Sequence, residues 1–226
     1  MPQPGFSHVR ALIFDLDGTL IDSKLDLILS VNAMLRQLGR RELPEGTISG
    51  YIGRGAPILV AQALGPGASE GECKQALEFF LSYYEAHKMD NTILYPGVAE
   101  ALERLVPLPM AVLTNKPVRV SVRILEALGL AERFSAVYGG NSFETKKPDP
   151  LGANTILREL KTAPNQAMLI GDSEIDVQTA RNAGTLSAIV NYGFGAHDRA
   201  SFPADLYVDR LTDLLPLLPS GQGVAR

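Results

Sequence analysis

The sequence has one cysteine, three histidines and no long apolar run, and each scarcity excludes a class of protein. With Cys73 alone, no disulfide can form within the chain, and no histidine segment pairs with it as in a thiol enzyme. Every apolar stretch is shorter than the roughly 18 residues that a membrane span needs. The first residues lack a cationic start followed by an apolar run, so we expect no signal peptide. A cytoplasmic protein that makes no membrane contact is therefore expected.

The chain also has no large excess of positive or negative charge. The formal net charge of -4 gives the chain no bulk attraction for nucleic acid, so an anionic substrate would have to be drawn in by local positive groups. Hydrophobic residues make up 46% of the 226 residues, which is enough for a buried core. A chain of this length forms one large domain, or a medium domain with a small insert. Monomer and homodimer both stay open.

Short apolar runs that end in polar residues or glycine recur along the chain and are typical of buried parallel strands. They lie at Ala11–Phe14, Met110–Leu113, Ala136–Tyr138, Ala167–Ile170, Ser187–Val190 and Leu206–Val208. Helical patterns lie between them, at Val98–Leu105, Arg119–Leu128, Leu151–Leu160, Ile175–Ala183 and finally Leu211–Leu218. Strands that alternate with helices predict an α/β domain built on a doubly wound parallel sheet.

A segment from about Leu25 to Asn91 interrupts this alternation. It has no clear strand and shows helical stretches at Leu25–Leu38, Gly55–Leu64 and Glu70–His87, with Phe79-Phe80 and Tyr83-Tyr84 as the simplest candidates for its core. Because the segment is too long for an ordinary connection, we interpret it as an inserted helical cap domain. The predicted boundaries are residues 1–22 and 93–226 for the core and 23–92 for the cap.

Polar residues follow the predicted strands at the carboxyl edge of the sheet, where ligands bind in open α/β folds. Clustered carboxylates repel one another and need a cation to stay ionised, and a set of oxygen ligands suits Mg²⁺. A lysine and the backbone amides near a glycine would offset the charge of a phosphate. Together with a nucleophilic carboxylate, this is equipment for phosphoryl transfer. The residues concerned are Asp15, Asp17, Gly18, Thr114, Asn115, Lys147, Asp172 and Asp176.

Four segments resemble the motifs of the haloacid dehalogenase-like hydrolase superfamily, in the superfamily's order and across nearly the whole chain. Within the superfamily the chain is most similar to the phosphoglycolate phosphatase group, because of the TNKP sequence and the segment Ile52-Gly53-Arg54-Gly55-Ala56 in the insert. The four segments are Asp15-Leu16-Asp17-Gly18-Thr19-Leu20, Thr114-Asn115-Lys116-Pro117, Lys147-Pro148-Asp149-Pro150 and Gly171-Asp172-Ser173-Glu174-Ile175-Asp176.

The resemblance implies catalytic roles for the motif residues. Asp15 would attack phosphorus and form an aspartyl-phosphate, and Asp17 would protonate the leaving alcohol and then activate water. Thr114 and Asn115 would hold phosphate oxygens, and Lys147 would neutralise the nucleophile and the phosphate. The presence of Asp17 argues against the dehalogenase and phosphonatase branches, in which this residue is replaced, since a halide leaving group needs no proton.

The resemblance also implies a magnesium site. Asp15, the backbone carbonyl of Asp17 and the carboxylate of Asp172 would bind the ion. Asp176 would support either the metal or Lys147.

Arg54, between two glycines of the insert, could grip a substrate carboxylate in bidentate fashion, which would suit 2-phosphoglycolate; the alternative is a solvated loop arginine. The leading hypothesis is a hydrolase acting on 2-phosphoglycolate or a similar small phosphorylated metabolite. A sugar phosphomutase of the β-phosphoglucomutase type would share all four motifs and stays open, although the insert has no evident sugar-binding pattern. A catalytically silent member is disfavoured because Asp15, Asp17 and Asp172 are all present.

Overall fold

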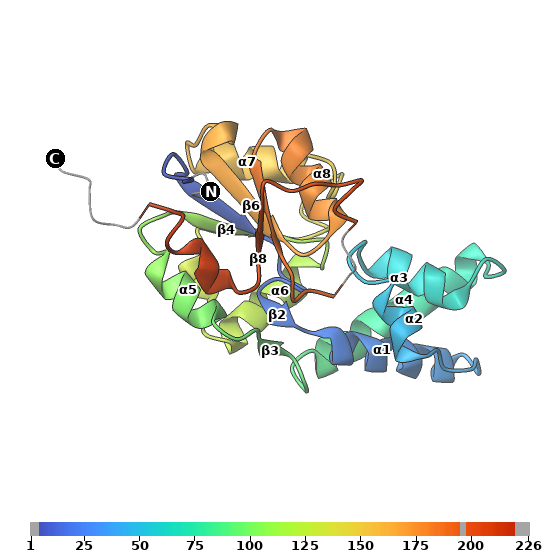
Figure 1. The fold of residues 1–226 in the computed structure, drawn as a ribbon. Helices are drawn as coiled ribbons and strands as arrows, with labels where there is room; N and C mark the ends of the chain where they lie inside the picture. Colours follow the sequence, from blue (N-terminus) through green and yellow to red (C-terminus); the bar gives the residue numbers. More distant parts are fainter. Residues whose placement is uncertain (1–4, 195–197, 220–226) are drawn as a thin grey trace.

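A six-stranded sheet forms the centre of the larger part of the molecule (Figure 1). The computed structural model describes residues 5–194 and 198–219. All neighbouring strands of this sheet are parallel, in the order β5-β4-β1-β6-β7-β8. The six predicted strands are confirmed to within one residue at each end. They are β1 (Ala11–Phe14), β4 (Met110–Leu113), β5 (Ala136–Tyr138), β6 (Ala167–Gly171), β7 (Leu186–Val190) and β8 (Leu206–Val208).

The chain starts in the middle of this sheet and fills its two halves in turn. From β1 it passes to the neighbouring β4 and on to the edge strand β5, then returns to β6 on the other side of β1 and continues to β7 and β8. This reversal puts the switch point, where ligands bind in such folds, at the carboxyl ends of β1, β4 and β6. The predicted doubly wound α/β fold is confirmed.

Helices cover both faces of the sheet (Figure 1). In β1, Leu12 and Phe14 join one apolar cluster with α5 and α6, whereas Ala11 and Ile13 join a second cluster with α7 and α8. Successive side chains of a strand point to opposite faces, so a sheet covered on both sides needs the unbroken apolar runs seen in the sequence. The helices are α5 (Val98–Arg104), α6 (Val118–Ala127), α7 (Leu151–Glu159) and α8 (Glu174–Ala183).

The predicted helix over Leu211–Leu218 is wrong. Only Leu211–Leu214 forms a turn of 3₁₀ helix. Pro216 lacks the N–H group that a continuing helix would use. The apolar pattern did mark a buried contact, because Leu211 and Leu214 are fully buried. Two other 3₁₀ turns among the described residues lie at Ala131–Arg133 and Pro164–Gln166.

Four helices between Asp22 and Ile93 form the second, smaller part of the molecule (Figure 1). Phe80 and Tyr84 are buried in this bundle, as expected, whereas Phe79 and Tyr83 are half-buried and stack on each other. The three helices expected here are present, and a fourth, α2, is too short to give a periodic signal. None of the described helices is long and apolar enough to cross a bilayer. The four are α1 (Lys24–Gln37), α2 (Glu45–Ser49), α3 (Ala56–Leu64) and α4 (Glu70–His87).

A small antiparallel sheet lies where the helical insert leaves and rejoins the core. It pairs β2 (Ile21–Asp22) with β3 (Ile93–Leu94). Just beyond it, the buried carboxylate of Asp26 accepts hydrogen bonds of 2.7–3.1 Å from the backbone N–H groups and the side chains of Asn91 and Thr92. The outgoing and returning segments are thereby tied together. The division into domains at residues 22 and 93 stays a prediction, and it falls at this sheet.

Candidate active site

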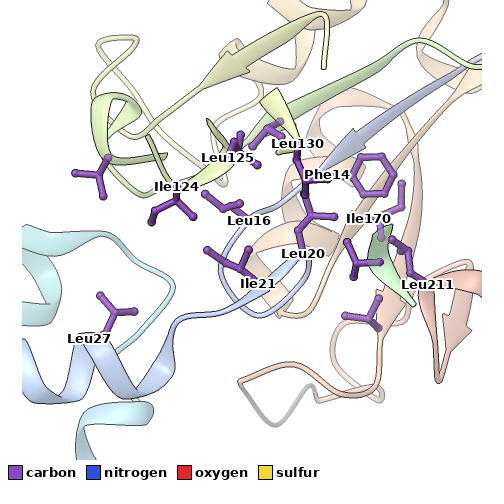
Figure 2. Packing of buried hydrophobic residues seen from close by; sticks show 14 of the residues in the cluster. Phe14, Leu16, Leu20, Ile21, Leu27, Ile124, Leu125, Leu130, Ile170 and Leu211 are labelled. Carbon is purple, nitrogen blue, oxygen red and sulfur yellow. The ribbon is translucent and has the colours of Figure 1, made fainter. Parts of the chain in front are cut away.

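The loop after β1 directs its acidic and apolar residues in opposite directions. Phe14 and Leu16 are buried in the core, and Figure 2 shows them packed near Ile124, Leu125 and Leu130. Full burial of a leucine side chain contributes about 1.5–3 kcal/mol, so residues such as Leu16 fix the path of the loop. The carboxylates that alternate with these anchors, described below, face the carboxyl edge of the sheet.

Gly18 brings this loop against the residue that follows β6. Its backbone has φ +83°, a conformation that favours glycine, and a Cβ atom there would lie 2.2 Å from Oδ2 of Asp172. On its other side Asp172 meets Gly193, and its Oδ2 accepts a hydrogen bond of 2.8 Å from the N–H of Phe194. The first and fourth motifs are therefore in direct contact, as the sequence predicted.

Lys147 lies between two carboxylates. Its Nζ atom is 2.9 Å from Oδ1 of Asp15 and donates a 2.6 Å hydrogen bond to Oδ1 of Asp176. All three residues are buried. Burial alone would lower the pKa of Lys147, but the two carboxylates outweigh it and hold that pKa above its usual value. The ammonium group is therefore charged, and it can offset negative charge beside Asp15.

Asp176 is committed to this support. Its second oxygen, Oδ2, accepts hydrogen bonds from the N–H groups of Asp172 and Ser173 and from the Ser173 hydroxyl, at 2.7–3.2 Å. Of the two roles expected for Asp176, its bonds fit the support of Lys147.

Three buried acids form a cluster that could hold a cation. One carboxylate oxygen from each of Asp15, Asp172 and Asp176 lies within 4.8 Å of the other two. Burial raises the pKa of Asp15 to about 6, although Lys147 counteracts it, and burial together with the other two acids raises the pKa of Asp172 well above its usual range. A hard divalent cation would remove this penalty, so the donor set fits Mg²⁺. The Asp17 carboxylate is not part of this cluster, so its predicted contact with a metal rests on its backbone carbonyl alone.

Asp17 binds a lysine that sequence reasoning did not identify. Both carboxylate oxygens accept hydrogen bonds of 2.9 Å from Nζ of Lys116, and Oδ1 also accepts one of 2.5 Å from the Ser23 hydroxyl. Lys116 is buried and donates a third hydrogen bond, of 2.7 Å, to the hydroxyl of Tyr84 on cap helix α4. Burial lowers the pKa of Lys116, but Asp17 and Tyr84 raise it by more, so the pKa lies above its usual value. The acid expected to handle protons is thus held by a buried cation.

Thr114 and Asn115 lie at the end of β4, where they were predicted. Thr114 is buried, and its Oγ1 accepts a hydrogen bond of 3.3 Å from the N–H of Lys116. The side chain of Asn115 donates to the carbonyl of Gly53 in the cap at 3.0 Å and to the carbonyl of Lys147 at 3.1 Å. Asn115 therefore joins core to cap, and contact between its side chain and a phosphate stays a prediction.

Arg54 does not line the same space as these residues. Its side chain is 55% exposed, and its guanidinium pairs with Glu174 at 3.1 Å. The flanking Gly53 and Gly55, with φ of +108° and +89°, bring the loop's backbone against the core: a Cβ atom on Gly55 would lie 3.0 Å from the Asn115 carbonyl. Because the backbone faces inward, the Arg54 side chain faces outward. The expectation that it grips a substrate carboxylate does not fit this geometry.

A cavity of about 40 Å³ lies between the core and the cap. A single water needs about 10–15 Å³, so this partly open space suits a small molecule. Asp15, Asp17 and Thr114 line it from the core, and Phe80 and Tyr84 line it from the cap. Among the described residues on its wall, Lys116 is the one cation. A second, larger space of about 380 Å³ adjoins Asp17 and Asp172 and is bordered by cap residues near α2.

The sequence signal for Lys116 and Tyr84 was weak but present. Lys116 stands inside the second motif, directly after two predicted site residues and within the TNKP sequence that resembles the phosphatase group. Tyr84 was assigned to the cap core on its apolar character, which its burial confirms, but the pattern could not indicate where its hydroxyl points. A charged residue inside such a motif, as Lys116 is, could have indicated a further site residue.

Comparisons with known proteins agree with this site. The family model described as haloacid dehalogenase-like hydrolase matches residues 12–190. A protein of Chromobacterium violaceum named phosphoglycolate phosphatase is 36% identical over 220 residues, covering 95% of this chain and 98% of its own length. A protein of Vibrio vulnificus with the same name is 35% identical, covering 93% of this chain and 96% of its own.

Solved structures agree as well. A crystal structure described as a predicted phosphoglycolate phosphatase from Haemophilus somnus aligns with a TM-score of 0.87 and 31% identity, covering 94% of this chain and 99% of that one. A haloacid dehalogenase-like family hydrolase from Streptococcus pneumoniae aligns with a TM-score of 0.82 and 25% identity, covering 92% and 98%. On its sequence, its fold and the four motifs that meet at one edge of its sheet, the chain belongs to the haloacid dehalogenase-like hydrolase family.

Proposed function

We propose that this protein is a Mg²⁺-dependent phosphatase that hydrolyses small phosphate monoesters through an aspartyl-phosphate on Asp15, with 2-phosphoglycolate as the favoured substrate. The observation that carries the proposal is the position of Asp15, buried beside both Lys147 and the acids Asp172 and Asp176 on the wall of a small cavity. The relatives named phosphoglycolate phosphatase support the choice of substrate.

The first step transfers the phosphoryl group from the substrate to Asp15. A carboxylate oxygen of Asp15 attacks phosphorus, and the bond from phosphorus to the alkoxy oxygen breaks. Asp17, two residues further on, gives a proton to that oxygen, so the product leaves as a neutral alcohol. Lys147 offsets the negative charge that gathers on the phosphoryl oxygens, which is where most of the catalysis of phosphoryl transfer arises.

The second step returns Asp15 to its carboxylate form. Asp17, now ionised, takes a proton from water while the water oxygen attacks phosphorus. The bond between phosphorus and Asp15 breaks, and inorganic phosphate is released. Asp17 is thereby reprotonated for the next cycle, so one residue serves as acid and then as base. The hydroxyl of Thr114 and the amides near Gly18 are suited to hold phosphoryl oxygens in both steps.

Asp15, the backbone carbonyl of Asp17 and Asp172 are the residues that would hold the ion, with Asp176 orienting Lys147 beside them. Bound there, Mg²⁺ supplies positive charge that keeps the acids ionised and offsets the charge of the phosphate. A closed cap excludes bulk water, so the attacking water must be one that Asp17 positions. We further propose that the protein acts in the cytoplasm as a monomer or homodimer.

The test is phosphate release by the purified protein with Mg²⁺, over a panel of about 50 small phosphate esters that includes 2-phosphoglycolate and glucose 1-phosphate. The proposal expects free phosphate from 2-phosphoglycolate at a kcat/KM in the enzyme range of about 10⁴ M⁻¹s⁻¹ or more. Glucose 6-phosphate formed from glucose 1-phosphate without free phosphate would replace the hydrolase with the phosphomutase. No phosphate from any ester would make the chain a silent binding member of the family.

A further inference from the structure

Lys116 is a buried cation that the proposed mechanism does not use. Its three N–H donors are occupied by the two oxygens of Asp17 and by the hydroxyl of Tyr84, so water takes no part in its solvation. Only one of these partners is charged. Lys147, by comparison, lies between two carboxylates beside the nucleophile. In the proposed first step Asp17 carries a proton, which leaves Lys116 without a charged partner, so one of its N–H groups can turn from Asp17 to an anionic group of the substrate.

Tyr84 adds a donor at the same place. In the described part of the chain its hydroxyl accepts a hydrogen bond from Lys116 and makes no hydrogen bond as a donor. Its ring also lies under the ammonium group, with Nζ of Lys116 at 4.5 Å from the ring centroid. A charged N–H and a phenolic O–H thus sit side by side on the cavity wall, and a carboxylate can accept from both.

The position of this pair follows the chemistry of the leaving group. Asp17 must reach the alkoxy oxygen to protonate it, and Lys116 lies 2.9 Å from Asp17. In a phosphorylated 2-hydroxy acid the carboxylate carbon is two bonds from that oxygen. Because Asp17 contacts the alkoxy oxygen, the substrate carboxylate lies close to Asp17 and therefore close to Lys116, which binds Asp17. Near α4 the other described residues of the lining are apolar, namely Phe80, Leu81 and Leu59, and none of them is a cation.

We propose that Lys116 and Tyr84 form the subsite that recognises an anionic group on the leaving alcohol, so that they, and not Arg54, select 2-phosphoglycolate over neutral phosphate esters. The proposal rests on the phosphatase function above and names the substrate class of that site. Because Lys116 comes from the core and Tyr84 from the cap, the substrate carboxylate is bound only when the cap is closed. Selection and closure are therefore one event, which suits an enzyme that must exclude water before phosphoryl transfer.

Two substrates that differ only in the carboxylate provide the test: 2-phosphoglycolate and 2-hydroxyethyl phosphate. The ratio of their kcat/KM values cancels any effect on Asp17 or on the chemical step, which both substrates share. For Lys116→Met the ratio should fall by about 30-fold or more, since a buried charged partner is lost. For Tyr84→Phe, which removes one oxygen atom, it should fall by about 3–10-fold.

Matched controls separate recognition from general damage. Lys74→Met removes an exposed lysine of α4, and Tyr83→Phe removes the hydroxyl of the half-buried neighbour of Tyr84. Both should leave the ratio within about 2-fold of wild type, as surface changes usually do, and so should Arg54→Ala. Thermal unfolding reports whether a variant is folded. If Lys116→Met fails to fold, Tyr84→Phe carries the test alone.

The failures are distinguishable. Equal losses for both substrates in Lys116→Met would mean that Lys116 only holds Asp17 in place. A fall in the ratio for Arg54→Ala would move the subsite to Arg54. A wild-type enzyme that cleaves both esters equally well overturns the subsite and leaves the phosphatase standing. A wild-type protein that cleaves neither of these two, nor any other ester of the panel, removes both proposals, whereas one that cleaves only other esters overturns the subsite and the choice of 2-phosphoglycolate and leaves the phosphatase standing.

Discussion

Gly18 and Asp172 approach so closely that a single methyl group does not fit between them: a Cβ atom on Gly18 would lie 2.2 Å from Oδ2 of Asp172. This contact holds the loop of the nucleophile against the acid that follows β6. The site thus depends on an absent side chain as much as on those present.

Gly18→Ala should therefore damage stability and activity together. The positive φ costs about 1 kcal/mol, the clash adds about 1–3 kcal/mol, and displacement of Asp172 should lower kcat/KM by about 100-fold. Gly129→Ala is the matched control, because its φ is +70° and nothing lies within 4 Å of the added Cβ. It should show the strain alone, with unchanged kinetics. Equal effects of the two substitutions in urea unfolding and in kinetics would show that the contact with Asp172 is unimportant.

Asp15→Asn should abolish turnover and leave the fold intact. Asparagine keeps the shape of the side chain but removes the nucleophilic carboxylate, and loss of a nucleophile lowers kcat by about 10³-fold or more. Steady-state phosphate release measures the activity, and thermal unfolding checks the fold. Activity within about 10-fold of wild type would remove Asp15 from its role, because such a remnant is too large for an enzyme without its nucleophile.

Chelation by EDTA should silence the enzyme, and added Mg²⁺ should restore it. The ion should also stabilise the folded chain, because it binds Asp15 and Asp172, two buried carboxylates whose charges repel each other. At about 100 times its Kd, Mg²⁺ should raise the Tm by roughly 5 °C. Asp172→Asn should lose most of this rise, whereas Glu103→Gln, which removes an exposed charge on α5, should keep it. A Tm that does not respond to Mg²⁺ in the wild type would argue against the site.

Asp26→Ala should be among the most destabilising single changes in the insert. The substitution leaves the N–H group and the hydroxyl of buried Thr92 without an acceptor and removes the acceptor of the Asn91 N–H, at a cost of about 2–4 kcal/mol. Asp90→Ala removes a nearby exposed carboxylate that pairs with His87 and should cost less than about 0.5 kcal/mol. Urea unfolding measures both. If the two variants were equally stable, Asp26 would not be what ties the two segments.

The sequence predicted the strands and the edge of the sheet at which the site lies, because buried parallel strands need unbroken apolar runs and their ends need polar residues. It identified Asp15, Lys147, Asp172 and Asp176, which the structure brings together. It did not find the pairing of Asp17 with Lys116, since the two residues lie on different elements and no local pattern records which way a long side chain turns.

Shorter features were missed for related reasons. Helix α2 and strands β2 and β3 span too few residues for a period to emerge. The expectation for Arg54 rested on residue type, and it could not include the positive φ angles of Gly53 and Gly55 that turn the side chain outward. Backbone direction at glycines is set by what the loop packs against, which a single sequence does not record.

The pairing of Asp22 with Ile93 means that the helical insert begins and ends at almost the same point in space. For the α/β core, the helical insert is therefore a long connection between two adjacent positions. A unit attached in this way can be exchanged for another of different length or shape without rerouting the core. Chimeras that graft a relative's helices between these two strands would inherit new substrate preferences while keeping the same reaction.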